Sequence, residues 1–165
     1  MGVAPDHPRL ARLEAFEEAA ELMDAASDPE GRRIRLAPAA AAAWRKLADA
    51  ARRDRMELIL ISGFRSYGYQ GGLLRAKLAA GETIEAALQV LAPPGYSEHH
   101  TGLAADFGTP GAETLEASFA ASPAYAWLEK NGPTLGWRLS YPAGNASGFI
   151  FEPWHWRFWP SLTNL

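Results

Sequence analysis

The sequence contains no cysteine. Disulfides, thiol nucleophiles and thiolate metal ligands are therefore excluded, so the protein ligands of any metal must be histidine, aspartate or glutamate. The sequence also lacks internal repeats and any apolar run long enough to cross a bilayer. Its 16 basic and 19 acidic residues give a net charge of −3, so no basic surplus indicates a nucleic-acid partner.

The N-terminus has no apolar segment of the kind that a secretory signal needs. Two locations stay open: the cytoplasm, or the cell envelope if a leader lies outside the printed sequence. The 165 residues are enough to bury a core, and we expect them to form a single domain that acts as a monomer.

Hydrophobic periodicity predicts helices first and then strands interleaved with helices. The helices expected from apolar spacing and helix-forming residues cover 8–25, 38–53, 67–80, 112–119 and 123–131. The strands expected from short apolar runs between turn residues cover 56–61, 103–107, 135–141 and 148–152, with the last two forming a hairpin. We therefore expect an α+β domain in which N-terminal helices pack on a small, mainly antiparallel sheet. Turns are expected at 28–31 and 93–95, and a short tail after Pro160.

Three of the four histidines fall in two short segments, SEHHTGLAAD at 97–106 and FEPWHWR at 151–157. A catalytic zinc ion takes three nitrogen or oxygen ligands from the protein and leaves one position for water. Two imidazoles and one carboxylate would satisfy that count, and a separate glutamate would serve as the base that activates the water. The two segments contain all four of these groups.

The spacing in the first segment is compatible with one site. Seven fully extended residues span roughly 23 Å, so the chain between His99 and Asp106 must double back, and Gly102 permits the turn. On the strand that follows, Asp106 and Ala104 share one face while their neighbours share the other. Asp106 can therefore point into a site while the alternate residues pack in the core.

In the second segment, Glu152 and His155 are three residues apart. Such positions face opposite sides of a regular strand. Both side chains reach one site only if the backbone turns at Pro153 and Trp154, and a proline is consistent with such a turn.

These segments, together with SGFRS at 62–66 and the following Gln70, resemble the motifs of the VanY-type zinc D-alanyl-D-alanine carboxypeptidases. The wider group also contains D-Ala-D-Ala dipeptidases and phage L-alanyl-D-glutamate endopeptidases. The resemblance covers about 35–160 and implies one zinc peptidase domain over 1–165, with 35–160 as the catalytic core carrying the zinc site on its sheet. Residues 1–34 would then be a helical N-terminal extension.

The resemblance implies that His99, Asp106 and His155 bind Zn²⁺ and that Glu152 is the catalytic base. Such a site can also accept other divalent ions. Arg65 falls on the family's arginine, which binds either a substrate carboxylate or the developing oxyanion.

The remaining residues that the resemblance places at the substrate site are Gln70, Ser97 and Tyr141. Two positions depart from the family. His100 stands where many members have glutamine, so it is either an alternative ligand or a residue behind the ligands. Ser140 stands where many members have an arginine before the Tyr-Pro pair. The specificity for the substrate end is therefore less firmly predicted than the metal chemistry.

The leading hypothesis is a zinc carboxypeptidase that removes a C-terminal D-amino acid from peptidoglycan stem peptides or their precursors, with D,D and L,D bonds both left open. This substrate would place the protein in a bacterial cytoplasm or envelope. One alternative is an L-alanyl-D-glutamate endopeptidase resembling phage lysins. Another is a catalytically silent module that binds zinc or the cell wall.

Overall fold

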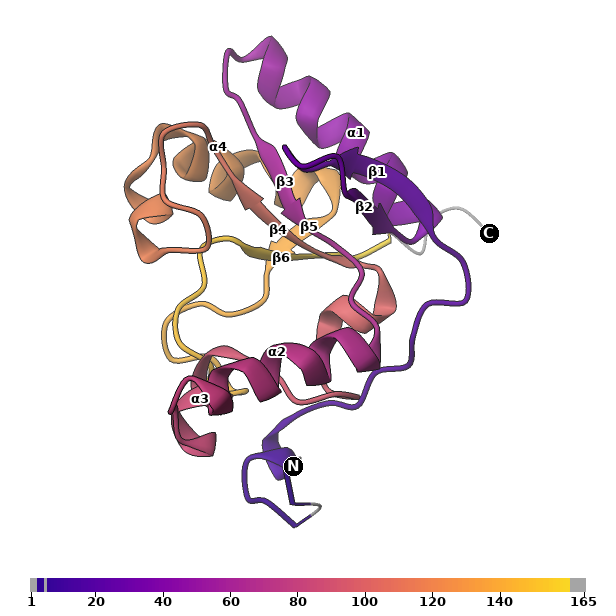
Figure 1. The fold of residues 1–165 in the computed structure, drawn as a ribbon. Helices are drawn as coiled ribbons and strands as arrows, with labels where there is room; N and C mark the ends of the chain where they lie inside the picture. Colours follow the sequence, from indigo (N-terminus) through magenta and orange to yellow (C-terminus); the bar gives the residue numbers. More distant parts are fainter. Residues whose placement is uncertain (1–2, 5, 161–165) are drawn as a thin grey trace.

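The computed structural model describes residues 3–4 and 6–160, and a four-stranded antiparallel sheet lies at its centre (Figure 1). In spatial order, the strands of this sheet are β3 (Ile59–Ser62), β4 (Ala104–Gly108), β6 (His155–Phe158) and β5 (Trp137–Leu139). A separate hairpin consists of β1 (Met23–Ser27) and β2 (Arg33–Leu36). The α-helices are α1 (Pro38–Arg53), α2 (Tyr67–Ala79), α3 (Ile84–Val90) and α4 (Pro123–Asn131). The 3₁₀ turns are η1 (Leu10–Arg12), η2 (Glu98–Thr101), η3 (Ala117–Ala121) and η4 (Pro133–Leu135).

The two faces of the central sheet differ in chemistry. On β4, Ala105 and Phe107 point into the main hydrophobic core, which α1 and α4 also line. Phe107 stacks on Trp44 of α1 with ring centroids 5.2 Å apart and meets the edge of Trp137 on β5 at 5.0 Å. Asp106 alternates with them and so faces the other side, where α2 and α3 lie (Figure 1).

The α+β class is confirmed, and several elements form where the sequence predicts them. The helices predicted at 38–53, 67–80 and 123–131 are α1, α2 and α4. The strands predicted at 56–61, 103–107 and 135–141 form as β3, β4 and β5 with shifted or shorter bounds. The first of these strands is less buried than its apolar run suggests, because β3 is an edge strand and Ile59 is 41% exposed.

The helix predicted over 8–25 is wrong, and with it the helical character of the 1–34 extension. Within the described part of this segment, only η1 is helical and residues 23–27 form β1. Tertiary hydrogen bonds replace helical ones: the backbone N–H of Phe16 donates to Gly95 O at 2.7 Å, and that of Ala19 donates to His100 O at 2.7 Å. The part of this segment that contains Phe16 and Ala19 is therefore extended and lies across the loop that carries the site. We call this part the N-terminal strap.

Two further predictions are wrong. No α-helix forms over 112–119: residues 112–116 form turns and bends, where Leu115 adopts a left-handed conformation with φ 58°, and residues 117–119 belong to η3. Residues 148–152 are not a strand, and β5 pairs instead with β6 three residues later. Helix α3, which is only seven residues long, was not predicted from the sequence.

No helix in the described ranges is both long and apolar enough to cross a lipid bilayer. The tail predicted after Pro160 lies outside the described residues.

Candidate metal centre

Three elements bring His99, Asp106 and His155 together. Asp106 on β4 is the antiparallel register partner of His155 on β6, so the two side chains start from adjacent positions on one face of the sheet. His99 comes from η2, which ends at Gly102 with φ 65°. A Cβ at Gly102 would lie 2.8 Å from the backbone nitrogen of Ala37, so only glycine fits this reversal of the chain.

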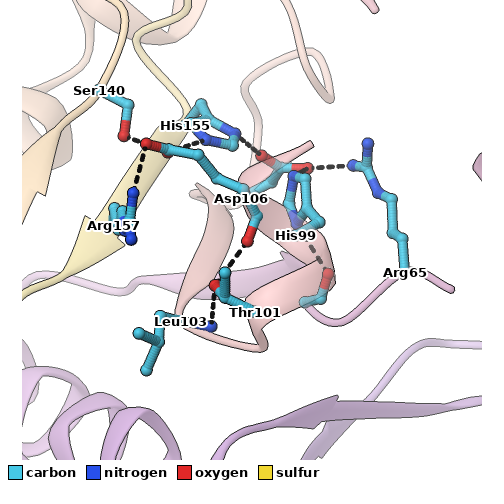
Figure 2. A network of polar contacts seen from close by, with 10 residues as sticks. Arg65, His99, Thr101, Leu103, Asp106, Ser140, His155 and Arg157 are labelled. Atoms are coloured by element: carbon cyan, nitrogen blue, oxygen red, sulfur yellow. Dashed lines mark hydrogen bonds and ion pairs between the residues drawn. The ribbon is translucent and has the colours of Figure 1, made fainter. Parts of the chain in front are cut away.

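The ligand atoms of these three side chains lie within 4.8 Å of one another. His99 Nε2 is 3.4 Å from Asp106 Oδ2, and His155 Nδ1 is 3.1 Å from Asp106 Oδ1 (Figure 2). All three side chains are buried. Two imidazoles and a carboxylate at these separations form a donor set that fits a tetrahedral divalent cation with a fourth position left open.

The second nitrogen of each imidazole is also engaged. His99 Nδ1 donates to the carbonyl of Gly63 at 2.7 Å, which leaves Nε2 as the nitrogen that faces Asp106. His155 Nε2 donates to Glu98 Oε2 at 2.9 Å, and Nδ1 faces Asp106. Contacts of this kind fix the orientation and the tautomer of a histidine that binds metal.

Neighbouring charges set the protonation of this cluster when no metal is bound. Burial lowers the pKa of His99 to about 4, with Arg65 acting in the same direction. Burial would also lower the pKa of His155, but its hydrogen bonds to Asp106 and Glu98 outweigh burial and raise it to about 10. Burial opposes ionisation of Asp106, but His99 and Arg65 more than compensate and hold its pKa well below the ordinary value. A metal cation at His155 Nδ1 would replace a proton there.

Arg65, which follows β3, contacts Asp106. Its Nη2 pairs with Asp106 Oδ2, its Nε donates to Ser62 Oγ at 3.1 Å, and its backbone N–H donates to His99 O. The side chain is 14% exposed. The guanidinium is thus fixed beside the ligand cluster, and Arg65 lines a cleft that His99, Asp106 and His155 also line.

Glu152 lines this cleft of about 860 Å³ together with the three clustered residues. The turn expected at Pro153 and Trp154 is present, with the backbone N–H of His155 donating to Glu152 O at 3.1 Å. Burial, together with the nearby carboxylates of Asp106 and Glu98, raises the pKa of Glu152 to about 7 against the opposing effects of His155 and Arg65. A carboxyl group with such a pKa can both accept and return a proton near neutral pH.

Ser97, Gln70 and Tyr141 also line the cleft. Gln70 is 1% exposed and donates from Nε2 to Ala92 O at 2.7 Å, while its Oε1 is buried without a partner among the described residues. Tyr141 stacks on His155, with centroids 4.7 Å apart and planes 24° from parallel.

His100 lies outside the ligand cluster. Its Nδ1 donates to Arg65 O at 2.6 Å, and its Nε2 accepts the backbone N–H of Gly95 at 3.1 Å. It therefore fastens the loop behind the site to the backbone of Arg65.

Glu98 was not predicted as a site residue from the sequence, yet it is buried and contacts three side chains: His155, Ser140 and Arg157. The hydrogen bonds and charges of these groups hold its pKa at about 2 in spite of burial. The available signal was an acid directly before the first histidine ligand. Arg157 forms an ion pair with Glu98, with 3.2 Å between Nη1 and Oε1.

The α+β fold, with a cleft that ends in a buried His–Asp–His cluster beside a carboxyl group of raised pKa, defines a class of domain suited to metal-assisted hydrolysis. Within that class, the chain belongs to the VanY family of D-alanyl-D-alanine carboxypeptidases, which it matches over residues 33–161. The predicted family is confirmed.

Individual proteins similar to this chain agree with this family assignment. The putative carboxypeptidase YodJ of Bacillus subtilis is 35% identical over 124 residues, which cover 72% of this chain and 44% of YodJ. The LD-carboxypeptidase LdcB has a solved structure with a TM-score of 0.69 and 28% identity, covering 87% of this chain and 65% of that one. A mutant of the vancomycin-resistance D,D-pentapeptidase VanY in complex with Zn(II) gives a TM-score of 0.68 and 29% identity, covering 88% and 82%. The chain thus spans less than half the length of YodJ.

Proposed function

We propose that this chain is a zinc-dependent carboxypeptidase domain that hydrolyses the bond before the C-terminal D-amino acid of a peptidoglycan stem peptide. The observation that carries the proposal is the meeting of His99, Asp106 and His155 within 4.8 Å, in the cleft that Glu152 also lines. Membership of the VanY family and the Zn(II) complex of a VanY relative support both the metal and the class of substrate.

His99 Nε2, His155 Nδ1 and an Asp106 oxygen are the atoms that would hold the ion. When bound, zinc supplies a Lewis acid for the scissile carbonyl and lowers the pKa of water in the site. Glu152 accepts the proton of the attacking water and then returns it to the leaving amine. Its pKa of about 7 suits both transfers.

Arg65 supplies the fixed positive charge of the site. The described contacts use its Nε and Nη2, so Nη1 is the nitrogen best placed to bind a ligand. A guanidinium can bind the C-terminal carboxylate of a substrate or stabilise the oxyanion of the tetrahedral intermediate.

Three other groups would orient the peptide. The buried Oε1 of Gln70 has no partner among the described residues, so it can accept an N–H from a peptide substrate. Ser97 offers a hydroxyl in the same cleft. Tyr141 stays a neutral phenol, because burial and then Glu98 raise its pKa far above the ordinary value, and it packs against His155.

The test is mass spectrometry of products from defined stem peptides, with purified protein and added zinc. Release of the last D-alanine from a pentapeptide indicates D,D activity, and release from a tetrapeptide indicates L,D activity. Cleavage only between L-alanine and D-glutamate would replace the proposal with the endopeptidase alternative. A zinc-loaded chain that cleaves none of these peptides would indicate a silent binding module.

Glu152→Gln is the control for mechanism. Because the amide cannot accept the proton, kcat should fall about 10²–10⁴-fold. Zinc content, measured by atomic emission on the same sample, should stay at the wild-type level because Glu152 is outside the ligand cluster. Activity within twofold of wild type would refute Glu152 as the base.

A further inference from the structure

Glu98 contacts one residue of the ligand cluster, His155, and two side chains beside it, Ser140 and Arg157. It directly precedes His99 in η2, and its side chain reaches His155 on β6. Its Oε2 accepts from His155 Nε2 at 2.9 Å and from the hydroxyl of Ser140 at 2.6 Å. Its Oε1 accepts from Arg157 Nη1 at 3.2 Å. Both carboxylate oxygens are therefore fixed.

The three partners come from different parts of the fold. Ser140 follows β5, while His155 and Arg157 lie two residues apart on β6 and so share one face of that strand. Arg157 is itself held between two rings, with its guanidinium carbon 4.7 Å from the Trp159 centroid and 4.9 Å from that of Phe16 in the N-terminal strap. The position of Glu98 is thus determined by the fold and not by solvent.

The orientation of His155 depends on this contact. The stacked ring of Tyr141 and the edge contact with His99 restrict the tilt of the imidazole. They do not fix the flip state of the ring, because a 180° rotation about Cβ–Cγ would put the carbons Cδ2 and Cε1 where Nδ1 and Nε2 now lie. A carboxylate fixed at Nε2 decides it, since Nε2–H then has a charged acceptor and Nδ1 is the nitrogen left for a metal.

We propose that Glu98 is a positioning residue that holds His155 with Nδ1 toward the metal, and that Ser140 and Arg157 set the place of the Glu98 carboxylate. The η2 turn then has two tasks, because it supplies His99 as one ligand and the acid that orients another. This inference rests on the proposed metal site but not on the proposed substrate.

The experiment measures zinc affinity by competition with a chromophoric chelator in Glu98→Gln, Ser140→Ala and Ser140→Thr. Glu98→Gln removes the charge and keeps the shape, so zinc affinity should fall roughly 10–100-fold. Ser140→Ala should weaken zinc binding in the same direction by less, and Ser140→Thr should keep the wild-type affinity because it retains the hydroxyl. The matched control is Glu129→Gln, which removes a carboxylate that accepts from Tyr125 at 2.9 Å outside the cleft, and it should leave zinc affinity unchanged.

A spectroscopic readout separates positioning from general destabilisation. The visible absorption of the cobalt-substituted protein reports the ligand geometry, and it should change in Glu98→Gln but not in Glu129→Gln. Wild-type zinc affinity together with an unchanged cobalt spectrum in Glu98→Gln would overturn the proposal. If Glu98→Gln fails to fold, equal zinc affinities of Ser140→Ala and Ser140→Thr would overturn it.

The two proposals fail in different ways. A wild-type protein that binds zinc but cleaves no stem peptide would refute the carboxypeptidase function, while the effect of Glu98 on zinc affinity would still stand. A wild-type protein that binds no zinc would refute both.

Discussion

The central strands β4 and β6 bury side chains on both faces, but the two faces differ in the chemistry of the groups that these side chains contact. On the α1 side, Phe107 and Trp156 are in contact with apolar groups and aromatic rings. On the cleft side, Asp106 and His155 are almost as inaccessible, but they contact charged and polar atoms. Neighbouring residues of one chain segment thus enter two environments, because side chains alternate along a strand.

The difference shows how the fold can support a buried charged cluster. The core face tolerates changes of shape at a cost in packing, whereas each charge on the cleft face requires a specific partner. Asp106 depends on Arg65 and two imidazoles, and His155 depends on two carboxylates. The apolar face keeps the strands in register, and the register keeps these partners together.

Substituting one residue on each face should separate the contribution of the metal ligands from that of core packing. These substitutions have the largest expected effects. His155→Ala removes a ligand atom, so zinc binding and peptide hydrolysis should both be lost. Phe107→Leu should lower the free energy of unfolding by about 1–3 kcal/mol through poorer packing. Its folded fraction should keep wild-type zinc affinity and kcat.

Urea denaturation, chelator competition and peptide assays on the same preparations check this pair. Loss of zinc binding in folded Phe107→Leu would show that the core face also determines the ligand geometry. Zinc-dependent activity in His155→Ala would remove this histidine from the proposed ligand set.

The two faces also differ in how far the sequence predicted them. Local sequence signals were enough to predict α1, where Pro38 occupies the first turn and an alanine run follows. They were also enough to predict which β4 side chains face the core and which face the site. The grouping of His99, Asp106 and His155 was also predicted, from ligand chemistry and family motifs. Each of these inferences used residues close in sequence or a motif of known order.

The missing parts depend on contacts between distant segments. Residues 8–25 have helical spacing, but the backbone of Phe16 and Ala19 bonds to the site loop, and no local pattern encodes those partners. The role of Glu98 was missed for the same reason, because Ser140 follows in sequence by 42 residues and His155 by 57.

Changing the pH should distinguish the two faces further. Of the β4 and β6 residues compared above, only those on the cleft face, Asp106 and His155, have titratable side chains. In the metal-free protein the pKa of His155 is raised to about 10 from 6.5. The stabilisation from this proton is complete below pH 6.5 and is lost as pH rises through 10, so metal-free protein should melt at progressively lower temperature over that range. Zinc displaces the same proton, so its affinity should rise by about tenfold per pH unit between pH 6 and 8.

Melting temperatures with chelator and with zinc, together with calorimetry in buffers of different ionisation enthalpy, measure these two effects. A melting temperature of metal-free protein that stays constant from pH 6.5 to 9.5 would contradict a charged His155 in the cluster. Zinc binding without proton release would contradict displacement at Nδ1.

The smallest expected effect compares two equivalent helix caps on the two sides of the sheet. Ser66 caps α2 by accepting the N–H of Tyr69 at 3.1 Å, and Ser122 caps α4 by accepting that of Tyr125 at 3.1 Å. Replacing either serine by alanine should cost about 1 kcal/mol of unfolding free energy. Because α2 follows Arg65 directly and carries Gln70 into the cleft, Ser66→Ala should also raise KM for the stem peptide, whereas Ser122→Ala should leave both kinetic constants unchanged. Urea denaturation and steady-state kinetics on the two variants test this, and equal KM values would mean that the start of α2 positions neither Arg65 nor Gln70.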